Sequence, residues 1–163
     1  MTPLISSALL GYLDIARVLL AHGADVNAVS GTMGSALHAV VSSERPEAVQ
    51  MIELLAAHGA AVNALDDLGE TPLWTAVSRR AGNRLMMEAL LRAGADANVV
   101  ARGRSLLHEA VEKETAETVS LLLRHGADRA LTDEAGASAL DLARELGREE
   151  IARLLERGEP SRG

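Results

Sequence analysis

The sequence contains no cysteine and no phenylalanine, and it holds one tryptophan and one tyrosine among its 163 residues. Without cysteine, the chain can form neither a disulfide framework nor a thiolate metal site. Aromatic rings are scarce although 48% of the residues are hydrophobic, so Ala, Leu, Val, Ile and Met must build the core. A core of small aliphatic residues favours thin, closely packed helices.

Positive charge is also scarce, because 16 Lys and Arg residues stand against 23 Asp and Glu residues, for a net charge of −7. This balance argues against a surface that binds nucleic acid or an anionic membrane. No apolar run is long enough to span a bilayer and no cleavable signal is present, so we expect a cytoplasmic protein. Lys113 is the only lysine beside 15 arginines, which favours a GC-rich gene of a bacterial kind.

What the chain does contain is an internal repeat, which has to be recognised before any other feature is interpreted. Five Ser/Thr-x-Leu segments begin 33, 36, 34 and 33 residues apart, at residues 2, 35, 71, 105 and 138. A second marker runs in phase with them, as HGADVN at 22–27, HGAAVN at 58–63, AGADAN at 93–98 and HGADRA at 125–130. Two markers in phase indicate one structural unit repeated along almost the whole chain.

Each repeat predicts two short helices and a loop. The Ser or Thr is a natural N-cap of the first helix, and the Leu two residues later lies on its buried side. A glycine ends the second helix, in the left-handed conformation. The cap, leucine and glycine positions are Thr2, Ser35, Thr71, Ser105 and Ser138; Leu4, Leu37, Leu73, Leu107 and Leu140; and Gly23, Gly59, Gly94 and Gly126. One such unit cannot bury its apolar face alone, whereas stacked units share a continuous core.

The pattern D-x-x-G-x-T-P-L-x-x-A at Asp66–Ala76, followed by LLRAGADAN at 90–98, resembles the ankyrin repeat. The resemblance extends over residues 2–158 and implies an all-α solenoid of stacked helix-turn-helix units linked by hairpin-like finger loops. The expected repeats are 2–34, 35–70, 71–104, 105–137 and 138–158, in a single array over 1–158, with a flexible tail at 159–163.

Some copies depart from the pattern. Extra residues around 44–46 and 80–81 fall in turns between helices, where insertions are tolerated. The finger between Asn98 and Ser105 is one residue shorter than the finger after Asn27, so we expect it to be shorter or bent. The last repeat carries charges in place of aliphatic residues and is typical of a cap. The first repeat has no preceding finger, so we expect the chain to begin within a longer array.

No residue pattern points to catalysis, a metal or a cofactor, and we expect no enzyme activity. All five histidines fit the repeat register, and the resemblance implies that His38 and His108 form hydrogen bonds within and between neighbouring repeats. Copies one repeat apart should lie roughly 10 Å apart, too far to share a zinc ion. The carboxylates of HEAVEKETAE at 108–117 are interpreted as a solvated face, and no phosphate-binding loop is present.

In the ankyrin family the concave surface of fingers and first helices commonly binds other proteins, and this chain is expected to bind a protein or peptide there. The candidate contact residues around the start of repeats three and four are Asp67, Leu68, Glu70, Trp74, Ser78, Arg79, Arg102, Arg104, Glu112 and Lys113. Arginine forms bidentate pairs with carboxylates, so a partner with acidic groups near Arg79 and Arg104 is expected. The alternative is that these charges only keep the surface soluble.

Two further points stay open on the sequence alone. The array could instead be a regulatory or targeting segment of a larger enzyme or effector whose N-terminal part is missing. A monomer is expected, although the first repeat, with Leu9 and Leu10 at places that are usually polar, could allow self-association.

Trp74 stands where the other repeats have Ile5, His38, His108 and Asp141. One interpretation is that the ring packs between repeats and its N–H reaches a loop carbonyl. The other is that a ring edge is exposed beside Glu70 and Arg104 and serves as a contact anchor.

Overall fold

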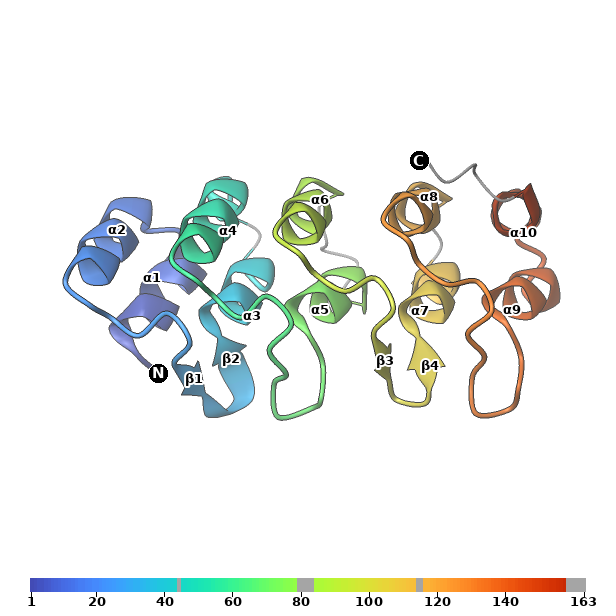
Figure 1. The fold of residues 1–163 in the computed structure, drawn as a ribbon, viewed down its shortest axis with the longest axis horizontal. Helices are drawn as coiled ribbons and strands as arrows, with labels where there is room; N and C mark the ends of the chain where they lie inside the picture. Colours follow the sequence, from blue (N-terminus) through green and yellow to red (C-terminus); the bar gives the residue numbers. More distant parts are fainter. Residues whose placement is uncertain (44, 79–83, 114–115, 158–163) are drawn as a thin grey trace. The chain divides into compact units, whose positions relative to one another are not determined.

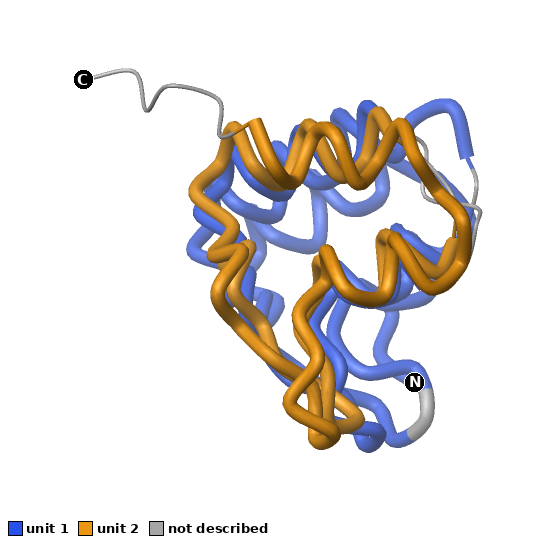
Figure 2. The backbone as a smooth tube through the Cα atoms, turned by 90° about the vertical axis from the view of Figure 1, so that its right-hand side faces the viewer, with its two compact units in different colours: residues 1–95 blue, residues 96–163 orange. Residues whose placement is uncertain are grey.

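Helices follow one another in pairs along the chain in the computed structural model, which describes residues 1–43, 45–78, 84–113 and 116–157 (Figure 1). These described residues form ten α-helices and two short hairpins, so the expected all-α repeat solenoid is confirmed. The chain divides into two compact units, residues 1–95 and residues 96–163, coloured blue and orange in Figure 2. The predicted tail lies outside the described residues.

The first unit contains three helix pairs and one hairpin. Its helices are α1 (Pro3–Leu10), α2 (Leu13–Ala21), α3 (Ala36–Val41), α4 (Ala48–Ala57), α5 (Pro72–Ser78) and α6 (Arg84–Arg92). Its strands β1 (Val29–Ser30) and β2 (Gly34–Ser35) pair antiparallel around the 3₁₀ turn η1 (Gly31–Met33). Helix α1 contacts α3 and α3 contacts α5, while α2 contacts α4 and α4 contacts α6. First helices and second helices therefore form two layers.

The second unit contains two helix pairs and the other hairpin. Its helices are α7 (Leu106–Lys113), α8 (Ala116–Arg124), α9 (Ala139–Glu145) and α10 (Glu149–Arg157). Its strands β3 (Val100–Ala101) and β4 (Arg104–Ser105) pair antiparallel. Helix α7 contacts α9 and α8 contacts α10, so the same two layers recur within this unit.

The predicted helix ends are found. The Thr2 hydroxyl accepts from the Ile5 N–H at 3.2 Å, and the Thr71 hydroxyl accepts from the Trp74 N–H at 3.1 Å. The predicted helix-ending glycines have φ angles of 80°, 82°, 97° and 84°, a left-handed conformation that glycine adopts without steric cost. Four of the five predicted core leucines are buried. Leu140 is only half-buried.

Three asparagines at the same register position, Asn27, Asn63 and Asn98, form hydrogen bonds with the following repeat, and we call them the asparagine ladder. The Asn27 side chain donates to the Gly59 carbonyl at 3.2 Å and accepts from the Ala61 N–H at 2.7 Å. Asn98 repeats both contacts, with the Gly126 carbonyl at 3.2 Å and the Asp128 N–H at 2.7 Å. Asn63 donates to the Gly94 carbonyl at 3.1 Å. One side chain per repeat therefore satisfies backbone groups of the next helix end.

Candidate protein-interaction surface

The fingers, at residues 28–34, 64–70, 99–104 and 131–137, project beyond the first helices within each unit (Figure 1). Two of them are closed by an aspartate. Asp66 Oδ1 accepts from the N–H groups of Leu68 and Glu70, both at 2.9 Å, and Asp133 Oδ1 does the same for Ala135 and Ala137. These Asx-type contacts hold the loop in one shape without a strand pair.

The other two fingers are hairpins. Between β3 and β4 the turn consists of Arg102 and Gly103, whose φ angles are 53° and 75°. Positive φ at both central residues is the type I′ geometry, which matches the twist of the flanking strands. This two-residue turn confirms the expected shorter finger. A Cβ atom on Gly103 would lie 2.4 Å from the Glu134 side chain, which would have to move, and the positive φ angle of 75° favours glycine there.

Histidine connects two of the fingers to the first helices. His38 Nδ1 accepts from the Ser35 N–H at 3.2 Å, so Nε2 carries the proton and donates to the Glu70 carbonyl at 3.0 Å. In the second unit, His108 Nδ1 pairs with the Ser105 hydroxyl at 2.7 Å and Nε2 donates to the Ala137 carbonyl at 2.9 Å. The implied hydrogen bonds within and between repeats are confirmed, and both rings are structural.

Five of the predicted contact residues lie at described positions of the first unit. Asp67 and Leu68 form the exposed tip of finger 64–70, where Leu68 is 64% exposed. Glu70 is buried, because its backbone carbonyl faces His38 at the base of the finger. Ser78 is half-buried at the end of α5. Arg79 lies outside the described residues, so the finger tip is the accessible part of this group.

Trp74 is the fifth of these residues, and only 1% of it is exposed. The prediction of an exposed ring edge is therefore wrong. The register position explains the burial, since Ile5, His38 and His108 are also buried at this place in their own repeats. Packing is confirmed, but the expected hydrogen bond is not found, because Nε1 has no partner among the described residues.

The remaining predicted contact residues lie in the second unit and are largely paired with one another. Arg104 forms an ion pair with Glu112, and its Nη1 lies 3.9 Å from Glu109. Lys113 Nζ lies 3.6 Å from Glu109, which is buried. Arg102 is exposed in the β3–β4 turn. An acidic partner would have to compete with Glu112 for Arg104. The structure thus brings Arg104 and Glu112 into contact within this unit, and it places Asp67 and Leu68 at one finger tip in the other.

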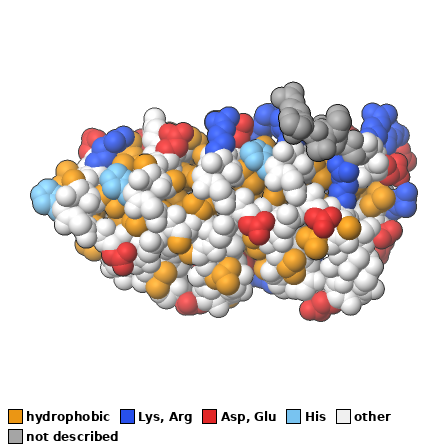
Figure 3. All heavy atoms as spheres, in the orientation of Figure 1, with side chains coloured by type: hydrophobic (Ala, Val, Ile, Leu, Met, Phe, Trp, Pro, Cys, Tyr) orange, Lys and Arg blue, Asp and Glu red, His pale blue; other side chains and the backbone are white. Residues whose placement is uncertain are grey.

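One group of exposed residues was missed at the sequence level. Val29, Leu65 and Val100 are 65%, 60% and 56% exposed, and each stands two residues after the ladder asparagine. Figure 3 shows hydrophobic side chains on the fingers among polar ones, whereas Lys and Arg side chains gather along the second helices. The signal was an aliphatic residue at one register position of a loop that is otherwise polar.

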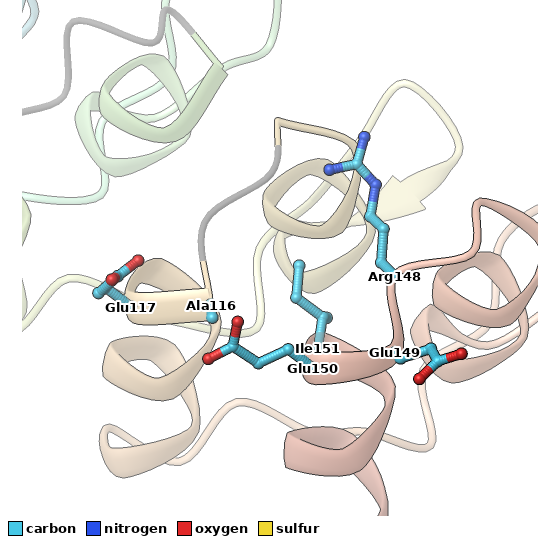
Figure 4. Close-up of a pocket in the computed structure, with 6 residues that line it drawn as sticks. All are labelled: Ala116, Glu117, Arg148, Glu149, Glu150 and Ile151. Atoms are coloured by element: carbon cyan, nitrogen blue, oxygen red, sulfur yellow. The ribbon is translucent and has the colours of Figure 1, made fainter.

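Within the described residues, no group of three or more His, Cys, Asp or Glu side chains could hold a metal ion. A pocket of about 270 Å³ lies where α8 and α10 begin, lined by Ala116, Glu117 and residues 148–151 (Figure 4). Its carboxylates are spread along the opening and do not converge on one point. None of the described helices is long and apolar enough to cross a membrane.

The carboxylate of Asp141, in the last repeat, has a lowered pKa. The Ser138 hydroxyl donates to Asp141 Oδ2 at 2.6 Å, and the Ser138 backbone N–H donates to it at 2.9 Å. These two hydrogen bonds favour the ionised form and lower the pKa of Asp141, with a smaller contribution from Arg144. The arrangement is a capping box at the start of α9, and it requires no ligand.

Comparison with known sequences identifies ankyrin repeats along the chain. A family profile described as ankyrin repeats (3 copies) matches residues 30–101 and 80–161, and one described as ankyrin repeats (many copies) matches residues 4–53. The chain is 38% identical over 74 residues to the probable E3 ubiquitin-protein ligase XBOS34 of Oryza sativa subsp. japonica, which covers 44% of this chain and 14% of that protein.

A second relative is the ADP-ribosylation factor GTPase-activating protein AGD4 of Arabidopsis thaliana. It is 35% identical over 72 residues, which cover 44% of this chain and 9% of the relative. The match therefore involves a small part of each of these two proteins.

Proposed function

Because the chain belongs to the family of ankyrin repeats, which are protein-interaction modules, we propose that it binds a protein or peptide partner through its fingers and first helices, the concave surface of such arrays. It does so as a cytoplasmic protein without catalysis of its own. The binding residues follow from exposure: the aliphatic residues on the fingers contact the partner, with Asp67 and Leu68 at the tip of finger 64–70 and Arg102 at the β3–β4 turn.

The observation that carries this proposal is the row of exposed aliphatic side chains on the fingers. Leu65 and Leu68 are 60% and 64% exposed on finger 64–70, which Asp66 already holds in shape. A preformed loop loses little conformational entropy on binding. Large apolar side chains at such a place are typical of the central contacts of an interface.

The charged residues on and near the fingers indicate which charge a partner should carry. Arg104 is neutralised by Glu112 within its own unit, so an acidic partner gains little there unless it displaces this carboxylate. Asp67 is the exposed charge next to Leu68. A segment that presents an apolar side chain beside a basic one fits finger 64–70 best.

The test is affinity capture with the full chain followed by measurement of the identified complex by calorimetry. Leu65→Asp combined with Leu68→Asp should weaken binding by at least about tenfold, since an interface hot spot contributes 2 kcal/mol or more when truncated. The matched control is Leu85→Asp, an exposed leucine on helix α6 of the same unit. Equal affinity of the finger variant and the control would refute the proposed surface.

A second proposal is that the array serves as a regulatory or targeting segment of a larger enzyme or effector. It is supported by the two relatives, which are named as a ligase and a GTPase-activating protein and are matched over a small fraction of their length. The full reading frame of the gene distinguishes the proposals, because an adjoining catalytic domain is required by the second and not by the first.

A further inference from the structure

Two leucines at the tip of finger 64–70 are exposed to solvent, although the shape of the finger does not depend on them. Leu65 and Leu68 are 60% and 64% exposed, and Asp67, whose side chain is exposed as well, lies between them in the sequence. The contacts that close this finger come from Asp66, which accepts two backbone N–H groups. The leucine side chains bury little surface on folding and are available to a partner.

Finger 131–137 of the second unit is closed in the same way but has different side chains. Asp133 closes it through two backbone N–H groups, as Asp66 closes finger 64–70. The positions of the two leucines and of the carboxylate between them are occupied there by exposed Thr132, Ala135 and Glu134. The carboxylate at the tip is thus kept, while both leucines are replaced by smaller side chains. The fold of the loop therefore does not require leucine at these places.

The side chain of arginine matches the tip of finger 64–70 in both of its parts. Its three methylene groups are apolar and can pack on Leu65 and Leu68 while the charged group stays in contact with water. The guanidinium donates two parallel hydrogen bonds to a carboxylate, and it is less strongly hydrated than the ammonium group of lysine. One arginine can therefore contact both leucines and Asp67 at the same time.

The fingers of the first unit do not supply this cation themselves. Fingers 28–34 and 64–70 contain neither Lys nor Arg. None of the ion pairs formed within the described part of the chain involves Asp67. In the second unit, by contrast, Arg104 already forms an ion pair with Glu112. The carboxylate of Asp67 is thus open to a cation from outside the chain, which its charge attracts.

We propose that finger 64–70 binds an arginine side chain of the protein or peptide partner, with the methylene groups on Leu65 and Leu68 and the guanidinium on Asp67. This inference rests on the proposed function, because it names the side chain that the partner contributes to that surface. Finger 131–137 is expected to bind arginine more weakly, since an exposed ion pair without apolar contacts contributes little.

Four blocked pentapeptides test the proposal on the full chain. They have the sequence acetyl-Ala-Ala-X-Ala-Ala-amide, in which X is arginine, lysine, citrulline or glutamate. Binding is followed in NMR titrations by the chemical shifts of the backbone amides of finger 64–70. The arginine peptide should bind about three- to fivefold more tightly than the peptide with citrulline, its neutral isostere. The lysine peptide should lie between these two, and the glutamate peptide should cause no saturable shift.

Variants of the finger separate the charged from the apolar contact. Asp67→Asn should remove the preference for arginine over citrulline, because it removes the carboxylate and keeps the shape. Leu65→Ser combined with Leu68→Ser should weaken the binding of both peptides to a similar degree. The matched control is Glu53→Gln, which removes an exposed carboxylate from α4 of the same unit and should leave both affinities unchanged.

Finger 131–137 provides a gain-of-function test. Thr132→Leu combined with Ala135→Leu gives this finger the two leucines of finger 64–70 beside its own carboxylate. Its backbone amides should then respond to the arginine peptide more strongly than to the citrulline peptide. Circular dichroism verifies that each variant is folded.

Three results would overturn the arginine site: equal affinity of the natural chain for the arginine and citrulline peptides, no response of finger 64–70, or an unchanged preference for arginine in Asp67→Asn. If a captured partner still depends on Leu65 and Leu68 in such a case, the proposed function stands and the arginine site alone fails. If the arginine peptide binds at the finger but a captured partner is insensitive to the leucine variants, the proposed function alone fails.

Discussion

The first repeat and the last repeat contain the same pair of helices, but their outer sides are built from different residues. The first repeat exposes Tyr12, Ile15 and Val18. The last repeat places Arg144 and Glu156 on its outer side, where they form an ion pair across the ends of α9 and α10. The comparison shows that the last repeat carries charged residues at positions where Ala8 and Leu20 of the first repeat are buried.

The same contrast holds inside the repeats, at the position that follows Ser/Thr-x-Leu. Ile5 is completely buried there in the first repeat, whereas Asp141 caps its own helix in the last. The register of a repeat therefore fixes where a residue lies in the helix. In the first unit this place is core, because α1 packs against α3.

The largest expected effect comes from exchanging these two residues. Ile5→Asp should lower the free energy of unfolding of the first unit by about 4 kcal/mol or more, because it buries a carboxylate where no cation is available. Urea unfolding followed by Trp74 fluorescence measures it, since this tryptophan belongs to the first unit. The reciprocal change, Asp141→Ile, should cause a much smaller loss, detectable by circular dichroism. Equal losses would mean that the two ends do not differ as described.

A smaller effect is expected at the paired positions of the second helix. Leu20→Ala should cost about 2–4 kcal/mol, because it leaves a cavity between the first two repeats. Glu156→Ala removes an exposed ion pair and should cost at most about 1 kcal/mol. Thermal and urea unfolding of both variants give the values. A cost at Glu156 that matched the cost at Leu20 would contradict the interpretation of the last repeat as a solvated end.

The double change Arg144→Val and Glu156→Leu should alter stability by less than about 1 kcal/mol, since it removes one exposed pair. It also gives the last repeat an apolar outer side like that of the first. An exposed apolar side promotes association, so light scattering should detect larger particles than the natural chain forms. The matched control is Arg153→Val with Glu149→Leu, which removes a different exposed pair of α10. Growth in the control alone would exclude the predicted role of Arg144 and Glu156.

The smallest effect concerns pH. Hydrogen bonds from Ser138 lower the pKa of Asp141 in the folded state, below its value in the unfolded chain. The ionised group therefore stabilises the fold above the unfolded pKa of about 3.9, and this contribution is lost as the pH falls through the lower folded pKa. The difference in Tm between the natural chain and Asp141→Asn should be present at neutral pH and shrink in acid. A difference that is constant with pH would refute this.

Much of the fold followed from the sequence because the repeat provides internal checks. The caps, the helix-ending glycines and the roles of His38 and His108 depend on local spacing, and the structure confirms them. For Trp74 the sequence permits two interpretations, because burial of a ring depends on how neighbouring repeats close around it. Its spacing in the sequence carries no such information.

The candidate surface was harder to predict. Family positions pointed to Glu70 and Arg104, but Glu70 is buried beneath the finger and Arg104 is held by Glu112. Such pairings form between side chains eight residues apart across a hairpin and a helix, and no pattern in one sequence specifies them. Val29, Leu65 and Val100 share one register position of the loop, and this shared position is the signal in the sequence that indicates them.

The asparagine ladder has a consequence for hydrogen exchange. Ala61 and Asp128 lie in exposed loops beyond a helix end, yet each donates its backbone N–H to an asparagine side chain of the preceding repeat at 2.7 Å. Their amide protons should therefore exchange with deuterium far more slowly than those of neighbouring loop residues. Each exchange rate would report the separation of one particular pair of repeats. The exchange rates of these two loop amides thus report how often neighbouring repeats separate, for one pair of repeats in each unit.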